Sequence, residues 1–280
     1  MTQIATTYID HMGSDLSVVN AARVSFGKTS LGECIEYDIF RDDPDVIKAA
    51  VAKYKEDGWV VTSDVDDWKV VITRPLMGDT KLIQYLAKHK HISPFGHAFA
   101  SFHVKAPVFV ARQLVKHKFL RWNEISRRYV DDEPEFYEPD VWRGRSDDKK
   151  QGSSEEVVDM LYWMVVDPEL SIEGHTQYDN VSDTPNRWSS YVNDRALDLY
   201  KAMLNSDVAP EQARMVLPQS TMTEWYWSGS LDAFADMCRL RCKEDTQYES
   251  RVVADQVSTI MQGLYPVSWA ALMEGDTDEQ

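Results

Sequence analysis

The chain has 280 residues, enough for one large domain or two small ones. Its 30 Lys and Arg stand against 46 Asp and Glu, a formal net charge of −16, which disfavours nucleic acid as a partner because a polyanion needs a broad basic surface. No apolar run approaches the length of a membrane span, and no secretory signal is visible at the start. The sequence therefore predicts a cytoplasmic protein that does not cross a membrane.

Capping residues and apolar periodicity predict the elements in the first half of the chain. Ser14 or Asp15 caps a helix, and Pro107 opens an apolar helix that leads into a basic run. In chain order, we expect a helix at 14–26, a helix at 44–56, a hairpin at 58–77, a helix at 79–90, a strand at 97–106 and a helix at 107–117.

The second half of the chain is predicted to be mostly helical. A long final helix begins near Leu231, and Pro266 is the point where it can break. Before it we expect a helix near 154–165 within an otherwise loop-like polar stretch, helices at 188–205 and 209–215, and a strand at 220–228. Together these elements predict an α+β fold with a central mixed or antiparallel sheet. We expect a single domain over residues 1–280.

The most unusual stretch is the basic run at 116–129, "KHKFLRWNEISRRY", which follows Arg112 and contains one acid, Glu124. So dense a cluster of cations repels itself unless an anion sits in it. Gln113, Asn123 and Glu124 could hydrogen-bond the edges of a polar heterocycle, and Trp122 could stack on its ring. A small anionic ligand fits this run, although for any single cation a solvated surface loop is the simpler interpretation.

Other chemistry-bearing patterns are weaker. His89, His91 and His97 lie within nine residues, but no carboxylate or cysteine stands at metal-ligand spacing, so we expect no metal site. Ser126 lacks a G-x-S-x-G context, and neither a G-x-G-x-x-G nor a P-loop motif is present. The three cysteines have no CxxC spacing and do not predict a disulfide framework.

Several blocks, in this order, resemble the flavin-dependent thymidylate synthases. Their R-H-R motif, which a serine follows after seven residues, stands here as Lys116-His117-Lys118 and Ser126. The other blocks are 12–26, 91–113, 136–139, 213–227 and 240–249, so the resemblance covers most of the chain. Residues near 31–78 and 140–185 resemble insertions, and we interpret the second one as a surface loop rather than a lid over the site.

The resemblance implies the ligands and the residues that contact them. It implies dUMP contacts at Gln113, Glu124, Ser126, Arg127 (through its backbone), Arg128, Arg214 and Arg241. It implies FAD contacts at Ser25, His91, Ser93, Lys116, His117, Lys118 and Phe119. Arg241, Ser126 and Glu124 are the candidate catalytic residues.

The same resemblance implies the reaction. The family transfers a carbon from 5,10-methylenetetrahydrofolate to C5 of dUMP, and NADPH reduces its FAD. It uses no cysteine nucleophile, in agreement with cysteines that lie outside the basic run here. Cations would then stabilise negative charge on the pyrimidine, and Arg241 is our choice for that role. The resemblance also implies a homotetramer whose active sites are shared between subunits.

Some positions depart from the family pattern. Both arginines of R-H-R are lysines, which keep the charge but lose the planar fork. Ser230, Asp232 and Asp236 stand where the family has flavin contacts, Asp245 replaces a histidine and Gly96 replaces a glutamate. Acids beside a pyrophosphate would repel it. Three readings follow: a reductive methylase, a folate-dependent hydroxymethylase of dUMP or dCMP, and a non-catalytic nucleotide-binding protein.

Overall fold

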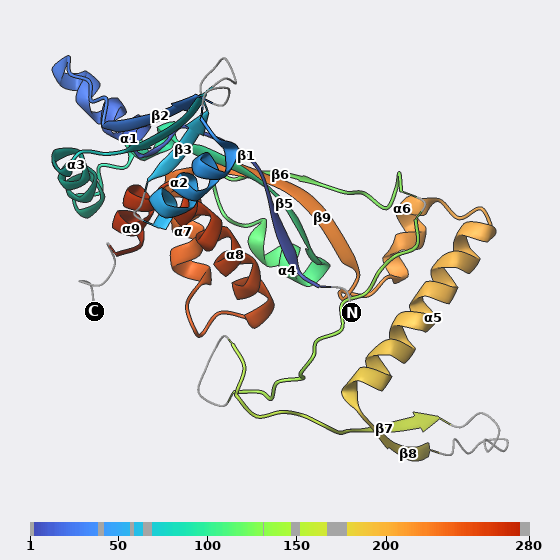
Figure 1. Ribbon diagram of the computed structural model, residues 1–280. Coiled ribbons are helices and arrows are strands. Elements are labelled where there is room, and N and C mark those ends of the chain that lie inside the picture. The colour runs from blue at the N-terminus through green and yellow to red at the C-terminus, as the bar shows by residue number, and fades with distance from the viewer. Residues whose placement is uncertain are drawn as a thin grey trace.

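A four-stranded antiparallel sheet forms the centre of the molecule in this computed structural model (Figure 1). The structure describes residues 3–38, 42–56, 59–63, 69–130, 132–146, 152–166 and 178–274. The strand order is β1 (Ala5–Met12), β5 (Phe99–Pro107), β9 (Met222–Ser230) and β6 (Arg121–Glu124). Helices α7 (Leu231–Arg241), α8 (Tyr248–Leu264) and α9 (Pro266–Glu274) pack together beside this sheet. The α+β expectation is confirmed, and the sheet is antiparallel.

Strict alternation of apolar and polar residues gives β5 its two faces. Phe102 and Val104 are fully buried, and each lies opposite a tryptophan of β9, Trp227 and Trp225 respectively. The opposite face of β5 carries polar residues, among them His103, whose Nε2 lies 3.0 Å from a carboxylate oxygen of Glu224. The apolar face joins the core formed with α7 and α8. Burying each of these large side chains stabilises the fold by about 1.5–3 kcal/mol.

A second, three-stranded sheet occupies the insertion near 31–78. Its order is β2 (Glu33–Asp38), β4 (Lys69–Arg74) and β3 (Val60–Ser63), and α2 (Pro44–Glu56) precedes β3. The predicted hairpin and the helix at 44–56 are confirmed, but the prediction missed β2. Nearby lie α1 (Asp15–Arg23) and α3 (Met77–Lys88). The buried Asp79 joins them, since it accepts hydrogen bonds from Arg23 Nη2 at 2.6 Å and Ser30 Oγ at 2.5 Å.

The predicted helix near 154–165 is wrong. Residues Leu161–Val166 form strand β7, which pairs with β8 (Tyr178–Asp183). Strand β8 leads directly into the N-terminus of α5 (Pro185–Asn205), as Figure 1 shows. Before β7 the chain doubles back on itself, with backbone hydrogen bonds from Gly144 N to Glu156 O (2.8 Å) and from Val158 N to Trp142 O (2.8 Å). We call residues 141–146 and 152–158 the strap. The apolar spacing at 154–165 fits a helix, but strand pairing satisfies this backbone instead.

The long final helix is also corrected, because it is three helices. Helix α7 ends at Arg241, and residues 242–247 form a turn before α8. The break expected before Pro266 is confirmed, since α8 ends at Leu264 and Pro266 begins α9. The buried carboxylate of Asp15 accepts hydrogen bonds from Val267 N at 3.1 Å and Ser268 N at 2.8 Å, which caps α9 from a distant part of the chain.

The remaining helices agree with their predictions within a few residues. The helix at 14–26 ends at Arg23 and continues as a 3-10 turn at Val24–Phe26. The region 209–215 forms α6 (Pro210–Ala213) and a 3-10 turn at Arg214–Val216, and the helix after Pro107 is α4 (Val108–Leu114). Sequence reasoning missed β1 and β6.

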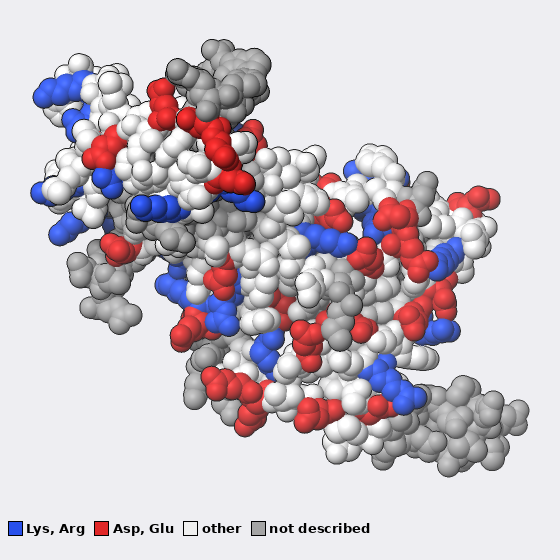
Figure 2. All heavy atoms as spheres, viewed as in Figure 1, with Lys and Arg blue, Asp and Glu red and all other residues white. Residues whose placement is uncertain are grey.

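Charged side chains of both signs are interspersed over the face drawn in Figure 2. Within the described ranges, no helix is both long enough and apolar enough to cross a membrane.

Candidate active site

Helix α4 separates two cavities, and neighbouring residues of this helix line different ones. Gln113 lines the first cavity and Arg112 lines the second. Successive side chains of an α-helix point about 100° apart, so adjacent residues can serve opposite sides. Six of the residues carried over from the family resemblance line these cavities, three in each.

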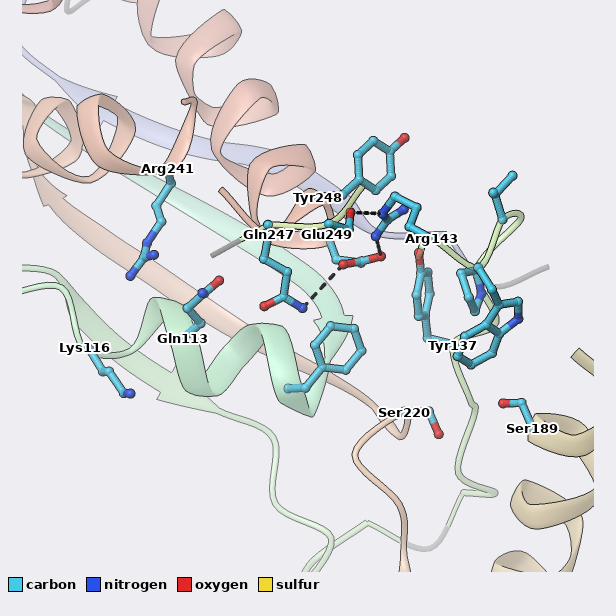
Figure 3. A pocket seen from close by; sticks show the side chains of 16 residues that line it. Gln113, Lys116, Tyr137, Arg143, Ser189, Ser220, Arg241, Gln247, Tyr248 and Glu249 are labelled. Carbon is cyan, nitrogen blue, oxygen red and sulfur yellow. Dashed lines mark hydrogen bonds and ion pairs between the residues drawn. The ribbon is translucent and has the colours of Figure 1, made fainter. Parts of the chain in front are cut away.

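The first cavity has a volume of about 650 Å³ and contains three of the predicted site residues. Figure 3 shows Gln113, Lys116 and Arg241 at one end and Tyr137, Arg143 and Ser189 at the other. Besides these six, the lining residues are Phe109, Pro139, Val141, Trp142, Gly152, Ser153, Ser220, Gln247, Tyr248 and Glu249. One end is thus rich in hydrogen-bond donors and the other is aromatic and polar.

His117 holds Arg241 in place at the first cavity. Arg241 Nε donates a hydrogen bond to His117 Nε2 at 3.0 Å. Burial, together with the charge of Arg241, lowers the pKa of His117 to about 4. Burial also lowers the pKa of Arg241, but an arginine remains protonated at neutral pH. His117 is therefore a neutral acceptor that orients a cation.

The strap forms a wall of the first cavity, so interpreting this part of the insertion as a plain surface loop is wrong. Arg143 Nη2 lies 2.5 Å from Oε1 of Glu249, a residue that is 5% exposed. The guanidinium also lies 4.5 Å from the ring centroid of Tyr248, and its Nε donates to Ser153 Oγ at 2.9 Å. These contacts fix the strap to the start of α8.

A glycine allows the strap to approach the turn between α7 and α8. Gly152 has φ +84°, and a Cβ on it would lie 2.8 Å from the backbone oxygen of Asp245. Any other residue would clash with this backbone and strain its own. Asp245 is one of the positions that depart from the family pattern, and in this structure its backbone lies next to Gly152 of the strap.

The second cavity, of about 510 Å³, contains Glu124, Arg127 and Arg214 together with Arg112. Glu124 is fixed by hydrogen bonds from Thr223 Oγ1 at 2.7 Å and Trp122 Nε1 at 3.1 Å. The remaining residues that line the second cavity are Val108, Ala111, Val115, Ile125, Glu211, Met215, Leu217, Pro218, Gln219, Thr221, Met222 and Thr223. The cavity thus carries three arginines and two carboxylates, Glu124 and Glu211, and the arginines could bind a phosphate.

Ser126 and Arg128 follow Glu124 in the chain but line neither cavity. Arg128 Nε donates to Ser126 Oγ at 3.1 Å, and its guanidinium lies 5.0 Å from the ring centroid of Tyr129. The two residues therefore form a small unit beside the second cavity.

The predicted flavin contacts are largely exposed. Ser25, His91, Ser93, Lys116, Lys118 and Phe119 are exposed, and His117 is half-buried. Phe119 is 82% exposed and has φ 66°, the left-handed region that is uncommon for a bulky residue. Cations and an exposed aromatic ring in one turn suit an anionic ligand with a flat ring system.

Two of the acidic departures, Asp232 and Asp236, lie on α7. Asp236 forms an ion pair with Arg239, one turn later, which offsets the repulsion expected from its charge. Asp232 Oδ1 is buried and has no hydrogen-bond partner within the described part of the chain. The basic turn after α4 thus fits a flavin, and Asp232 is the position that opposes it.

None of the described residues that line the two cavities is a cysteine. The described residues contain no group of three or more His, Cys, Asp and Glu that could hold a metal ion. Cys238 is buried, and burial raises the pKa of its thiol.

Sequence reasoning missed Arg143 and Ser250, and gave no role to Tyr248 and Glu249. The last two stand in the block at 240–249. Nothing in the polar run around Arg143 indicates that it reaches a buried acid more than a hundred positions away.

Comparison with known proteins places the chain in a family. The family model described as "Thymidylate synthase complementing protein" matches residues 7–267. A flavin-dependent thymidylate synthase of Thermus thermophilus is 31% identical over 95% of this chain and 74% of its own length. Another, of Kosmotoga olearia, is 31% identical over 95% of this chain and 88% of its own length.

Solved structures agree with this result. The UMP/dUMP methylase PolB from Streptomyces cacaoi bound with 5-Br dUMP has a TM-score of 0.64 and 25% identity, over 97% of this chain and 95% of that chain. The same methylase bound with 5-Br UMP has a TM-score of 0.66 and 24% identity, over 98% and 95%, and supports the fold. The chain therefore belongs to the flavin-dependent thymidylate synthase family.

Proposed function

We propose that this protein methylates C5 of dUMP to give dTMP, with 5,10-methylenetetrahydrofolate as carbon donor, FAD as cofactor and NADPH as reductant. The observation that carries the proposal is the gathering of Gln113, Lys116 and Arg241 at one end of the first cavity. These residues come from two distant blocks of the chain, and the family resemblance implies a ligand role for each of them.

The role proposed for Arg241 is to stabilise negative charge on the pyrimidine ring. Removing a proton from the ring nitrogen, or adding a nucleophile to the ring, leaves charge on the carbonyl oxygens. A guanidinium held by neutral His117 is already oriented toward this charge, so little reorganisation is needed when it develops. Lys116 adds a second cation at the same end of the cavity.

Lys116, His117, Lys118 and Phe119 would hold FAD, with Ser25, His91 and Ser93 as further contacts. When bound, FAD supplies the hydride that completes the methyl group. The two lysines would neutralise its pyrophosphate, and the exposed ring of Phe119 would pack on a flat part of the cofactor. The Asp236–Arg239 ion pair keeps one of the acidic departures from opposing this binding.

Glu124, Arg127 and Arg214 would bind the sugar and phosphate end of dUMP. They line the second cavity, on the other side of α4 from Gln113. We therefore propose that the second cavity of one subunit completes the first cavity of another in a homotetramer. Each active site would then contain Arg241 of one chain and Arg214 of its neighbour.

Hydroxymethylation of dUMP or dCMP is the second candidate, and one observation favours it. Asp232, whose Oδ1 is buried without a hydrogen-bond partner in the described ranges, stands where the family resemblance implies a flavin contact. A carbon transfer that ends with water needs no hydride, so it would tolerate weakened FAD binding.

The visible absorption spectrum of the purified protein, before and after adding FAD and removing the excess, separates the two candidates. Retained flavin absorbance and dTMP formation that consumes NADPH in step would support the methylase. A protein that takes up no FAD and forms a hydroxymethylated nucleotide would support the second candidate.

A further inference from the structure

Ser250 of α8 forms a hydrogen bond with the side-chain amide of Gln113. Ser250 Oγ donates a hydrogen bond to Gln113 Oε1, and Ser250 is fully buried. Helix α8 packs against α4 at this point. A glutamine amide has one acceptor oxygen and one NH2 donor group, so directing its oxygen toward α8 leaves the NH2 group to face the first cavity.

The other groups at this end of the cavity are donors as well. Lys116 and Arg241 carry N–H groups and cannot accept a hydrogen bond. Glu249 is the one carboxylate among the described residues that line the cavity, and Arg143 already occupies its Oε1 at 2.5 Å. Its Oε2 lies 3.4 Å from Gln247 Nε2. Gln247 directs its NH2 group to Glu249 and so leaves its Oε1 as an acceptor in the cavity, whereas Gln113, Lys116 and Arg241 are the donors that a base entering this end meets.

The two common pyrimidines differ at the atom that this arrangement would test. Uracil has a carbonyl oxygen on C4, which accepts hydrogen bonds. Cytosine has an amino group on C4, which donates them. A donor placed against a donor leaves a hydrogen bond unmet once the base has displaced the water between them, and this lowers the affinity. Polar mismatches of this kind discriminate far better than differences in size.

We propose that Ser250 is a positioning residue that fixes the Gln113 NH2 group toward the first cavity and so makes the site prefer uracil nucleotides over cytosine nucleotides. The inference rests on the proposed function in so far as a pyrimidine nucleotide occupies the first cavity. It adds the residue that imposes the choice of base and the amide group through which that residue acts.

Equilibrium binding of dUMP and of dCMP to the intact, as-purified protein tests this inference without requiring turnover. The wild type is expected to bind dUMP about 5- to 150-fold more tightly than dCMP, the range for one unmet hydrogen bond. Ser250→Ala frees the amide to rotate, so the ratio of the two affinities should fall toward one. Ser250→Thr keeps the hydroxyl and should restore the preference. Gln113→Glu replaces the NH2 group by an acceptor and should shift the preference toward dCMP.

Ser258→Ala is the matched control. It removes a hydroxyl from the same helix, at a residue that accepts a hydrogen bond from Trp269 Nε1 at 3.1 Å and lines neither cavity. Its nucleotide preference should match the wild type, and circular dichroism would confirm that every variant is folded.

The outcomes separate this inference from the proposed function. Equal binding of dUMP and dCMP by the wild type would overturn the inference, whether or not dTMP forms. A folded Ser250→Ala variant that keeps the full preference would overturn the role of Ser250. A preference for dUMP that Ser250→Ala abolishes, in a protein that makes no dTMP, would support the inference and refute the methylase.

Discussion

The two cavities beside α4 differ in how far their charged residues are already engaged. In the first cavity, Arg241 is held by His117, and Arg143 is held by Glu249 and Ser153. In the second, Arg127 Nη1 donates a hydrogen bond to the backbone oxygen of Asp132 at 2.5 Å, whereas Arg214 is exposed and donates a 3.4 Å hydrogen bond to the backbone oxygen of Glu211. The first cavity is thus preorganised within one chain, whereas Arg214 in the second remains available to a ligand or to another subunit.

This difference agrees with a nucleotide that spans two chains. Gln113 and Arg112 are neighbours in sequence but line different cavities, and this division favours a ligand that two chains hold together. A base-binding half and a phosphate-binding half on opposite sides of a helix are what the proposed sharing of sites requires.

Removing the cation of the first cavity should have the largest effect. We expect Arg241→Ala to lower kcat by about 10²- to 10³-fold, the usual loss when one preorganised donor is removed from a developing charge. Steady-state dTMP formation measures this effect. Arg195→Ala is the control, since it removes an exposed arginine paired with Asp198 on α5. A kcat within a factor of two of the wild type, about the scatter of such assays, would refute the role of Arg241.

Releasing the strap should destabilise the protein. Arg143→Ala leaves the buried Glu249 carboxylate without its cation, which costs about 3 kcal/mol or more when such a pair is broken. Urea unfolding measures the change. Adding Glu249→Gln to this variant removes the unpaired charge and should recover part of the loss. If the single variant is as stable as the wild type, the strap is not held by this ion pair.

Disrupting the second cavity should weaken nucleotide binding. We expect Arg214→Ala to reduce dUMP affinity by about 1.5–3 kcal/mol, as for loss of a hydrogen bond to a charged group. Arg128→Ala, beside the cavity, is expected to act in the same direction. Isothermal titration would measure both, again with Arg195→Ala as control. Unchanged affinity in the two variants would remove this surface from the site.

The His117–Arg241 contact predicts a smaller, pH-dependent effect. The pKa of His117 is lowered from 6.5 to about 4 in the folded protein, so between these values the unfolded chain binds more protons than the native one. The contribution to stability is therefore complete above pH 6.5 and is lost as the pH falls toward 4. Because His117 is half-exposed, solvent screening should keep the change small. Unfolding across this range should show a shallower acid-side loss for His117→Gln than for the wild type. Parallel curves would contradict the assignment.

Local patterns in the sequence predicted much of the fold. Helices with clear starts, such as the one after Pro107, and the alternating strand at 97–106 are confirmed. The family resemblance predicted site residues that lie on both sides of α4. The strand at 161–166 was missed because its pairing partner lies beyond residue 177, and no local pattern reveals such a pairing.

Contacts between distant residues limit prediction of the site in the same way. Arg143 meets Glu249, and Asp15 caps a helix that begins at Pro266, across separations that residue spacing does not encode. Likewise, Ser250 is an ordinary buried helix residue until α4 packs beside it and brings Gln113 within hydrogen-bonding reach.

Subunit complementation tests the central claim most directly. Arg241→Ala and Arg214→Ala chains would be purified separately, their reduced activity would be measured alone at a limiting dUMP concentration, and they would then be co-refolded and assayed for dTMP formation. If each site combines the first cavity of one chain with the second cavity of another, some mixed sites contain both wild-type arginines, and activity returns. If mixed assemblies form but gain no activity over the separate chains, the two arginines act within one chain, and the proposed sharing of sites is wrong.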